Sequence, residues 1–168
     1  VTGNTSLSGL INAVGGDVFI ETVNGNIVTN ANIGSDEVIA FESLFGDFLQ
    51  TGGVINPLNG GVVIAARNIT TSNVITSRNI QDILQPDDLV DEAGLPEVFA
   101  GINVADIPNA SIVIFSSGEA NLSGLAATQN VGLNVSINER GNALGGLSPF
   151  NNVVTTGNVF ATGNVDIF

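Results

Sequence analysis

The side chains able to do chemistry in this chain are almost all carboxylates. Sixteen Asp and Glu stand against three Arg, and His, Cys and Lys are absent. Thiol nucleophiles, Schiff-base lysines, imidazole bases and the usual zinc ligands are therefore excluded. Paired carboxylates remain, because two of them can share the acid and base roles of glycoside hydrolysis.

One carboxylate pair stands out by its spacing. Asp17 and Glu37 lie 20 residues apart, each near the start of an apolar run, and Glu21 and Glu42 offer a neighbouring pair. In adjacent coils of a repeat such side chains would lie about 4.8 Å apart, where like charges raise one pKa or recruit a cation. A carbohydrate-active lyase or hydrolase is one interpretation of Asp17 and Glu37. The other is a solvated acidic edge or an adventitious Ca²⁺ site.

A second acidic group consists of Asp87, Asp88, Asp91 and Glu92. These carboxylates are candidate Ca²⁺ ligands, although they lack the alternate spacing and internal Gly of a calcium loop. The alternative is that they favour the N-terminus of a short helix over 86–93. No other cofactor is expected.

The net charge and the hydrophobicity of the chain limit the classes of partner that it can bind. The chain carries a formal charge of −13, so it lacks the cations that neutralise phosphates, and nucleic acid is not an expected partner. No apolar run of about 18 residues is present to span a bilayer, so membrane insertion is not expected either. With 43% hydrophobic and 11% charged residues, the chain is predicted to fold as one β-rich domain over 1–168.

An internal repeat governs the fold prediction, because short apolar runs recur along most of the chain. They lie at 18–22, 38–42, 62–66, 112–116, 133–137 and 153–156. Successive starts differ by 20, 24, 50, 21 and 20 residues. The unit is therefore about 21 residues, and the long step holds either two units or one unit with an insertion.

Each run is followed by two further apolar elements. The second begins at Ile27, Leu49, Ile69, Leu122 and Leu144, and the third near Ile33, Ile55, Ile75, Leu125 and Leu147. Three short strands per unit, with Gly and Asn at the corners, predict an all-β fold built as a parallel β-helix, also called a β-solenoid. The alternative is a β-sandwich pilin with donor-strand exchange, in which residues 1–14 complete the sheet of a neighbour.

Asparagine is abundant at the predicted corners. Asn26, Asn68 and Asn121 each lie directly before a predicted second strand, and they either form a hydrogen-bonded ladder between coils or serve as turn residues. Five sequons are candidate glycosylation sites, at Asn4, Asn68, Asn109, Asn121 and Asn134.

One segment departs from the repeat. Residues 81–108 hold 7 of the 16 acidic residues and 3 of the 5 prolines. We interpret this segment as an acidic excursion from the coil, with a short helix, rather than as a separate domain.

The two ends of the chain share a sequence. Thr2-Gly3-Asn4 is repeated as Thr156-Gly157-Asn158 and Thr162-Gly163-Asn164. A solenoid end exposes unpaired strand edges, which favour head-to-tail stacking with a second copy. The predicted assembly interface is Val1, Thr2, Gly3, Asn4, Val159, Phe160, Val165, Ile167 and Phe168.

The repeats GGDVFIETVNGNIVTNANI, GGVVIAARNITTSNVITSRNI and NVVTTGNVFATGNVDIF resemble those of filamentous-haemagglutinin-like exoproteins, which are secreted β-helix adhesins. The segment 55–60 is similar to the Asn-Pro-Asn-Gly-Ile motif of their secretion domain, with Leu58 inserted and Gly61 in place of Ile. The resemblance implies a right-handed parallel β-helix without enzymatic activity, located outside the cell or on its surface.

The expected function is therefore a structural subunit of an extracellular filament, a pilus-like fibre or a surface adhesin. It would self-assemble head to tail, with surface glycans as a further partner. The alternatives are a carbohydrate-active β-helix enzyme and a glycan-binding module.

Overall fold

The structure, a computed structural model, describes residues 3–43, 45–76, 111–116, 118–127, 135–138, 154–161 and 165–167. These residues form eighteen short strands joined by turns, and none of them lies in a helix. Among them, accordingly, no helix is long and apolar enough to cross a membrane. The predicted helix at 86–93 and the whole acidic excursion, residues 81–108, lie outside the described residues.

The strands form three sheets, A, B and C, of six strands each. Sheet A contains β1 (Thr5–Leu7), β4 (Ile27–Thr29), β7 (Phe48–Gln50), β10 (Ile69–Thr70), β13 (Ala120–Leu122) and β16 (Val154–Thr156). Sheet B contains β2 (Leu10–Ala13), β5 (Asn32–Ser35), β8 (Ile55–Pro57), β11 (Val74–Thr76), β14 (Leu125–Ala127) and β17 (Val159–Ala161). Sheet C contains β3 (Val18–Thr22), β6 (Ile39–Ser43), β9 (Val62–Ala66), β12 (Ile112–Ser116), β15 (Val135–Asn138) and β18 (Val165–Ile167).

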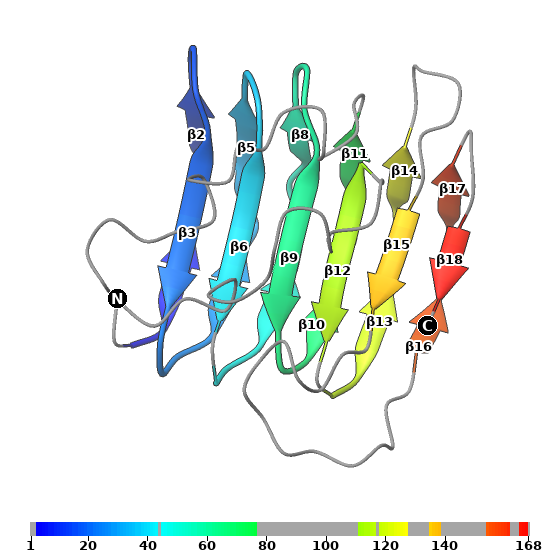
Figure 1. The fold of residues 1–168 in the computed structure, drawn as a ribbon. Coiled ribbons are helices and arrows are strands. Elements are labelled where there is room, and N and C mark those ends of the chain that lie inside the picture. The colour runs from blue at the N-terminus through cyan, green and yellow to red at the C-terminus, as the bar shows by residue number, and fades with distance from the viewer. Residues whose placement is uncertain are drawn as a thin grey trace.

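The chain visits the sheets in the fixed order A, B, C, and each round forms one coil. Every strand pairs in parallel with the strand three places along the chain, so six coils stack from β1 to β18. Figure 1 shows this progression from the blue N-terminal coil to the red C-terminal coil. The predicted parallel β-solenoid is confirmed. Residues 1–14 are not a donor strand for a sandwich, because β1 and β2 pair with β4 and β5 of the same chain.

Register offsets between coils vary along the molecule. Thr5 lies opposite Ile27, an offset of 22 residues, and Ile27 lies opposite Phe48, an offset of 21. In sheet C, Val62 lies opposite Ile112, an offset of 50 residues. The long sequence step therefore holds a single coil that carries an insertion between β11 and β12.

The structure corrects three strand assignments made from the sequence. The run at 153–156 falls in β16 of sheet A rather than in the sheet C series that begins at Val18. The inward residues of β7 and β11 are Phe48 and Val74, one position before the predicted Leu49 and Ile75. Leu49 is 38% exposed. The errors at β7 and β11 have the same cause, since apolar residues stand at adjacent positions and only one of them faces inward.

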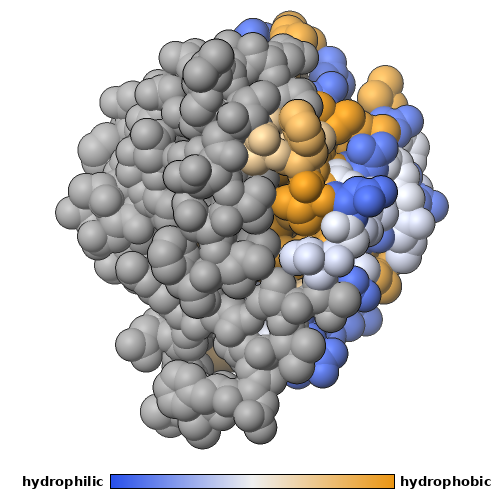
Figure 2. Space-filling view, turned by 90° about the vertical axis from the view of Figure 1, so that its right-hand side faces the viewer, coloured by the Kyte–Doolittle hydropathy of each residue, from blue (hydrophilic) through white to orange (hydrophobic). Residues whose placement is uncertain are grey.

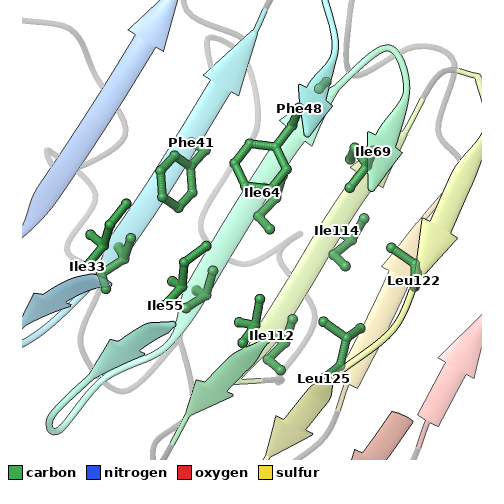
Figure 3. Packing of buried hydrophobic residues seen from close by; sticks show 14 of the residues in the cluster. Ile33, Phe41, Phe48, Ile55, Ile64, Ile69, Ile112, Ile114, Leu122 and Leu125 are labelled. Carbon is green, nitrogen blue, oxygen red and sulfur yellow. The ribbon is translucent and has the colours of Figure 1, made fainter. Parts of the chain in front are cut away.

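The core is a set of apolar columns that run along the solenoid axis. Ile33, Ile55, Val74 and Leu125 are directly stacked in sheet B, and each is at most 2% exposed. Figure 3 shows Ile33, Ile55 and Leu125 of this column on the same side of the core as one another, with residues of sheets A and C such as Phe48 and Ile64 beside them. Because like side chains stack, each coil buries its apolar residues against the coil on either side.

Sheet C is buried on both faces in its middle strands. All five residues of β6, β9 and β12 are buried, including the outward positions Ala40, Glu42, Val63, Ala65, Val113 and Phe115. This explains why β9 and β12 are continuous apolar runs, as is usual for parallel strands covered on both sides. Sheets A and B alternate between buried and more exposed positions instead.

Gly53 is required at one corner between sheets A and B. It has a φ of +71°, and a Cβ at this position would meet the carbonyl oxygen of Ala31 in the coil before. A side chain would therefore strain the backbone and separate the coils.

We predict that Gly53→Ala lowers the free energy of unfolding by about 2–4 kcal/mol, through the left-handed conformation and the backbone clash. Gly16→Ala is the matched control, because nothing lies within 4 Å of its Cβ position and its φ is outside the positive range. Equilibrium urea unfolding measures both variants. Equal stability of the two would contradict the assigned corner geometry.

Candidate functional site

A ladder of side chains runs along the corner that precedes sheet A. Each member sits one residue before a strand and accepts a hydrogen bond from the backbone N–H of the next member, one coil further on. The bonds are Asn26 N–H to Asn4 Oδ1 at 2.9 Å, Asp47 N–H to Asn26 Oδ1 at 2.9 Å, Asn68 N–H to Asp47 Oδ1 at 3.3 Å and Glu119 N–H to Asn68 Oδ1 at 2.8 Å. This ladder satisfies backbone donors that lie where the strands begin.

The prediction of an asparagine ladder is confirmed for Asn26 and Asn68 and wrong for Asn121. Asn121 lies within β13, opposite Thr70, and its side chain is exposed. Sequence reasoning missed Asn4 and Asp47. Their spacing was the available signal, because the ladder positions 4, 26, 47 and 68 are separated by 22, 21 and 21 residues.

Asp47 also forms an ion pair with Arg67 at the same corner. Arg67 Nε donates to Asp47 Oδ1 at 2.9 Å and its second terminal nitrogen donates to Oδ2 at 3.0 Å, so the pair is bidentate. Asn68 Nδ2 adds a third hydrogen bond, at 2.9 Å to Oδ1. An Arg bound to a carboxylate in this way was not visible in the sequence, because the partners lie 20 residues apart.

These contacts change the pKa of both groups. Partial burial raises the pKa of Asp47, but the hydrogen bonds and charge of Arg67, with the bonds from Asn68, outweigh it and hold the pKa below its usual value. The hydrogen bond to Asp47 and its negative charge raise the pKa of Arg67. The corner therefore keeps its charges fixed, unlike a catalytic acid whose proton must be exchanged near neutral pH.

Similar polar contacts link the coils at the other corners. Asp17 Oδ1 accepts a hydrogen bond from Val38 N–H at 2.7 Å before sheet C, and Asn32 Oδ1 accepts one from Val54 N–H at 3.1 Å before sheet B. After sheet C, the Ser43 hydroxyl donates to the Gly25 carbonyl at 2.7 Å. Polar side chains thus join neighbouring coils at all three corners.

The structure does not bring Asp17 and Glu37 into register. Asp17 lies opposite Val38, because β3 pairs with β6 through Val18 and Ile39. The carboxylates that do stand opposite each other are Glu21 and Glu42. Glu42 is 6% exposed, which leaves it almost inaccessible to a polysaccharide chain.

The four carboxylates of the predicted Ca²⁺ site lie outside the described part of the chain: Asp87, Asp88, Asp91 and Glu92. Within the described ranges, no group of three or more His, Cys, Asp and Glu is placed to hold a metal ion. Of the sequon residues, Asn109 and Asn134 also lie outside these ranges. Asn4 and Asn68 accept ladder hydrogen bonds, and Asn68 Nδ2, the atom that would carry a glycan, donates to Asp47.

The two ends of the solenoid are the remaining surface of interest. We call the side of β1, β2 and β3 that faces away from the other coils the N-edge, and the corresponding side of β16, β17 and β18 the C-edge. Within the described strands, each of these six pairs on one side only. The inward apolar residues near the edges are only partly buried: Leu7, Ile11, Ala13, Ile20, Val159 and Ala161.

The predicted interface residues divide between these edges. Gly3 and Asn4 lie in the first coil, and Val159, Phe160, Val165 and Ile167 lie in strands of the last. Val1, Thr2 and Phe168 are outside the described residues. Figure 2 faces the C-edge side of the molecule and shows apolar surface beside polar surface on its described part.

No family model, curated protein or solved structure matches the chain.

We predict that removing the Asp47 carboxylate destabilises the fold in two separable steps. Asp47→Asn keeps an oxygen for Asn68 N–H, as Asn26 does for Asp47, and loses only the half-exposed ion pair, about 0.5 kcal/mol. Asp47→Ala also loses the ladder acceptor, for a total of about 1–2 kcal/mol. Thermal and urea unfolding at pH 7 measure both variants, and equal losses would contradict the ladder role.

The same pair gives a pH prediction for stability. Because the pKa of Asp47 is lowered in the folded state, its stabilising contribution is complete above the unfolded-state pKa of about 3.9 and is lost as pH falls through the folded-state pKa. The stability difference between the unmodified chain and Asp47→Asn should therefore be constant near neutrality and shrink below about pH 4. A difference that persists undiminished at lower pH would contradict this sign.

Proposed function

We propose that this protein is a non-enzymatic structural subunit that assembles head to tail through β-strand stacking, forming an extracellular filament or a fibrous surface adhesin. One observation supports this most directly. At the N-edge and the C-edge, the strands end in the same backbone arrangement that is paired on both sides in the strands between them, and the described inward residues there, such as Ile11 and Val159, are only partly buried. A second copy offers a surface of matching shape and hydrogen-bonding pattern to either edge.

Apolar side chains in the first and last coils also favour contact with a second copy. Leu10 is 78% exposed, Val14 85% and Phe19 50% in the first coil, and Phe160 is 56% exposed in the last. Outward residues of the middle coils, such as Leu58, are also exposed, so the ends differ from the middle in their inward residues. Ile11 and Val159 are only partly buried, whereas the inward residues Ile27, Ile55 and Ile64 are at most 2% exposed. Apolar surface at both ends therefore gains burial when copies stack.

A carbohydrate-active enzyme is less well supported. The proposed pair Asp17 and Glu37 is out of register, and Asp17 holds the Val38 N–H instead. In the pair that is in register, Glu21 and Glu42, the Glu42 carboxylate is buried. No described feature favours hydrolysis or elimination over a structural role.

Location and attachment follow from composition and resemblance. A β-solenoid stabilised by stacking without any cysteine suits an exposed fibre, and the repeats resemble those of secreted adhesins. We therefore propose an extracellular or cell-surface location, with surface glycans as an attachment target and no role for nucleic acid.

We expect purified protein to form filaments whose length increases with concentration. Six coils at about 4.8 Å each predict an axial repeat of about 29 Å per subunit. Cryo-electron microscopy measures the repeat, and analytical ultracentrifugation measures the mass. Monomers at every concentration tested would refute the proposal.

A charge at the N-edge should block assembly without unfolding the subunit. Leu10→Lys places a cation on the exposed edge strand, where charged residues prevent edge pairing, and we expect assembly to require at least about tenfold higher concentration. Leu58→Lys is the control, because Leu58 is 65% exposed but follows β8 in the third coil. Equal assembly of both variants would exclude the N-edge as the interface.

A further inference from the structure

We propose that the C-edge of one copy meets the N-edge of the next in the single register that continues the existing columns, with Asn158 as the residue that sets it. In this register, Asn158 Oδ1 accepts a hydrogen bond from Leu10 N–H of the following copy, and Phe160 lies opposite its Asn12. This inference rests on the proposed head-to-tail assembly and specifies its partner surface.

The register follows from the pairing within sheet B. One inward column contains a directly opposed residue from each coil: Ile11, Ile33, Ile55, Val74, Leu125 and Val159. The position just before this column is Leu10 in the first coil and Asn158 in the last. The outward position just after it is Asn12 in the first coil and Phe160 in the last.

The hydrogen bond assigned to Asn158 is already made once inside the molecule. Asn32 occupies the same position one coil after Leu10, and its Oδ1 accepts from Val54 N–H, the equivalent position of the next coil, at 3.1 Å. In the last coil the carbonyl of Asn158 accepts from Leu125 N–H toward the preceding coil at 3.1 Å. By equivalence with Asn32, its exposed side chain points the other way, toward an incoming coil.

Apolar contacts select the same register. Val159 and Ala161 are half-buried and inward, and they would stack on the half-buried Ile11 and Ala13. A slip by one residue would set these inward side chains against outward ones, so the apolar contacts between the two edges would be lost. The exposed ring of Phe160 would lie diagonal to Leu10, which is 78% exposed, and cover it.

The sheet B edges of the two copies also match in charge. β2 and the described residues 156–161 contain no ionisable side chain. A chain of net charge −13 therefore presents an uncharged surface in sheet B at both ends, where like-charge repulsion between copies is smallest.

Cysteine cross-linking tests the register directly, because the chain has no cysteine of its own. We would mix Asn12→Cys protein with Phe160→Cys protein under mild oxidation. In the proposed register the two Cα atoms lie about 4.8 Å apart, within the range that a disulfide spans. The two positions lie five coil steps apart in one molecule, about 24 Å, so a double variant can cross-link only between copies and should give a ladder of covalent oligomers.

Leu10→Cys mixed with Phe160→Cys is the matched control. These residues are two positions out of register, so their Cα atoms would be about 8 Å apart and a disulfide would not form. Cross-linking of the 12 and 160 pair alone supports the proposal. Cross-linking of the 10 and 160 pair alone, or of 12 with 12, overturns it while leaving self-assembly intact. Filaments without any cross-link also overturn the register, and monomers throughout refute both the register and the proposed function.

A second variant tests Asn158 itself. Asn158→Ala removes one interfacial acceptor, and we expect the critical concentration for assembly to rise about threefold to tenfold, the effect of one hydrogen bond. Asn56→Ala is the control, because Asn56 is exposed on β8 in the third coil, away from both edges. An Asn158→Ala critical concentration equal to that of the control would overturn the assigned hydrogen bond.

Discussion

Every coil of this protein depends on its neighbours for backbone hydrogen bonds. In parallel pairing, Ile27 N–H donates to the Asp47 carbonyl of the coil after it, and Asn30 N–H donates to the Leu7 carbonyl of the coil before it. A single coil of three short strands makes none of these bonds alone, and unpaired buried backbone groups are costly. The stack is therefore the unit of stability, and an exposed edge is its weakest part.

At the corners this pattern of backbone hydrogen bonds is interrupted, and side-chain oxygens accept the hydrogen bonds of the backbone N–H groups there. The ladder through Asn26, Asp47 and Asn68 gives each interrupted N–H an oxygen in the adjacent coil. Arg67 then balances the one charged member of that ladder. In the strands, at the corners and in the core, hydrogen bonds and apolar contacts thus join equivalent positions of adjacent coils. The proposed head-to-tail assembly would extend the same pairing to a second copy at either edge.

Two features separate this solenoid from a purely regular one. The offset of 50 residues between β9 and β12 places a long insertion in the fourth coil without breaking the register. Sheet C is also buried on its outer face, where Glu42 stands in register with Glu21 among apolar neighbours. Glu42 therefore belongs to a covered layer, whereas Asp17 and Asp47 act at corners as hydrogen-bond acceptors.

The amino-acid sequence by itself determined the solenoid class, because runs such as 62–66 and 112–116 recur with glycine and asparagine between them. It also indicated two of the ladder residues, Asn26 and Asn68, as candidates from their place before a strand, with a turn role as the alternative. Tertiary structure decided the rest. The side-chain period of a strand is two, so adjacent apolar residues such as Phe48 and Leu49 are equivalent in sequence, and only the register with Ile27 and Ile69 turns Phe48 inward. The pairing register of sheet C likewise separated Asp17 from Glu37 and paired Glu21 with Glu42. The stacking of neighbouring coils joined Asp47 to Arg67.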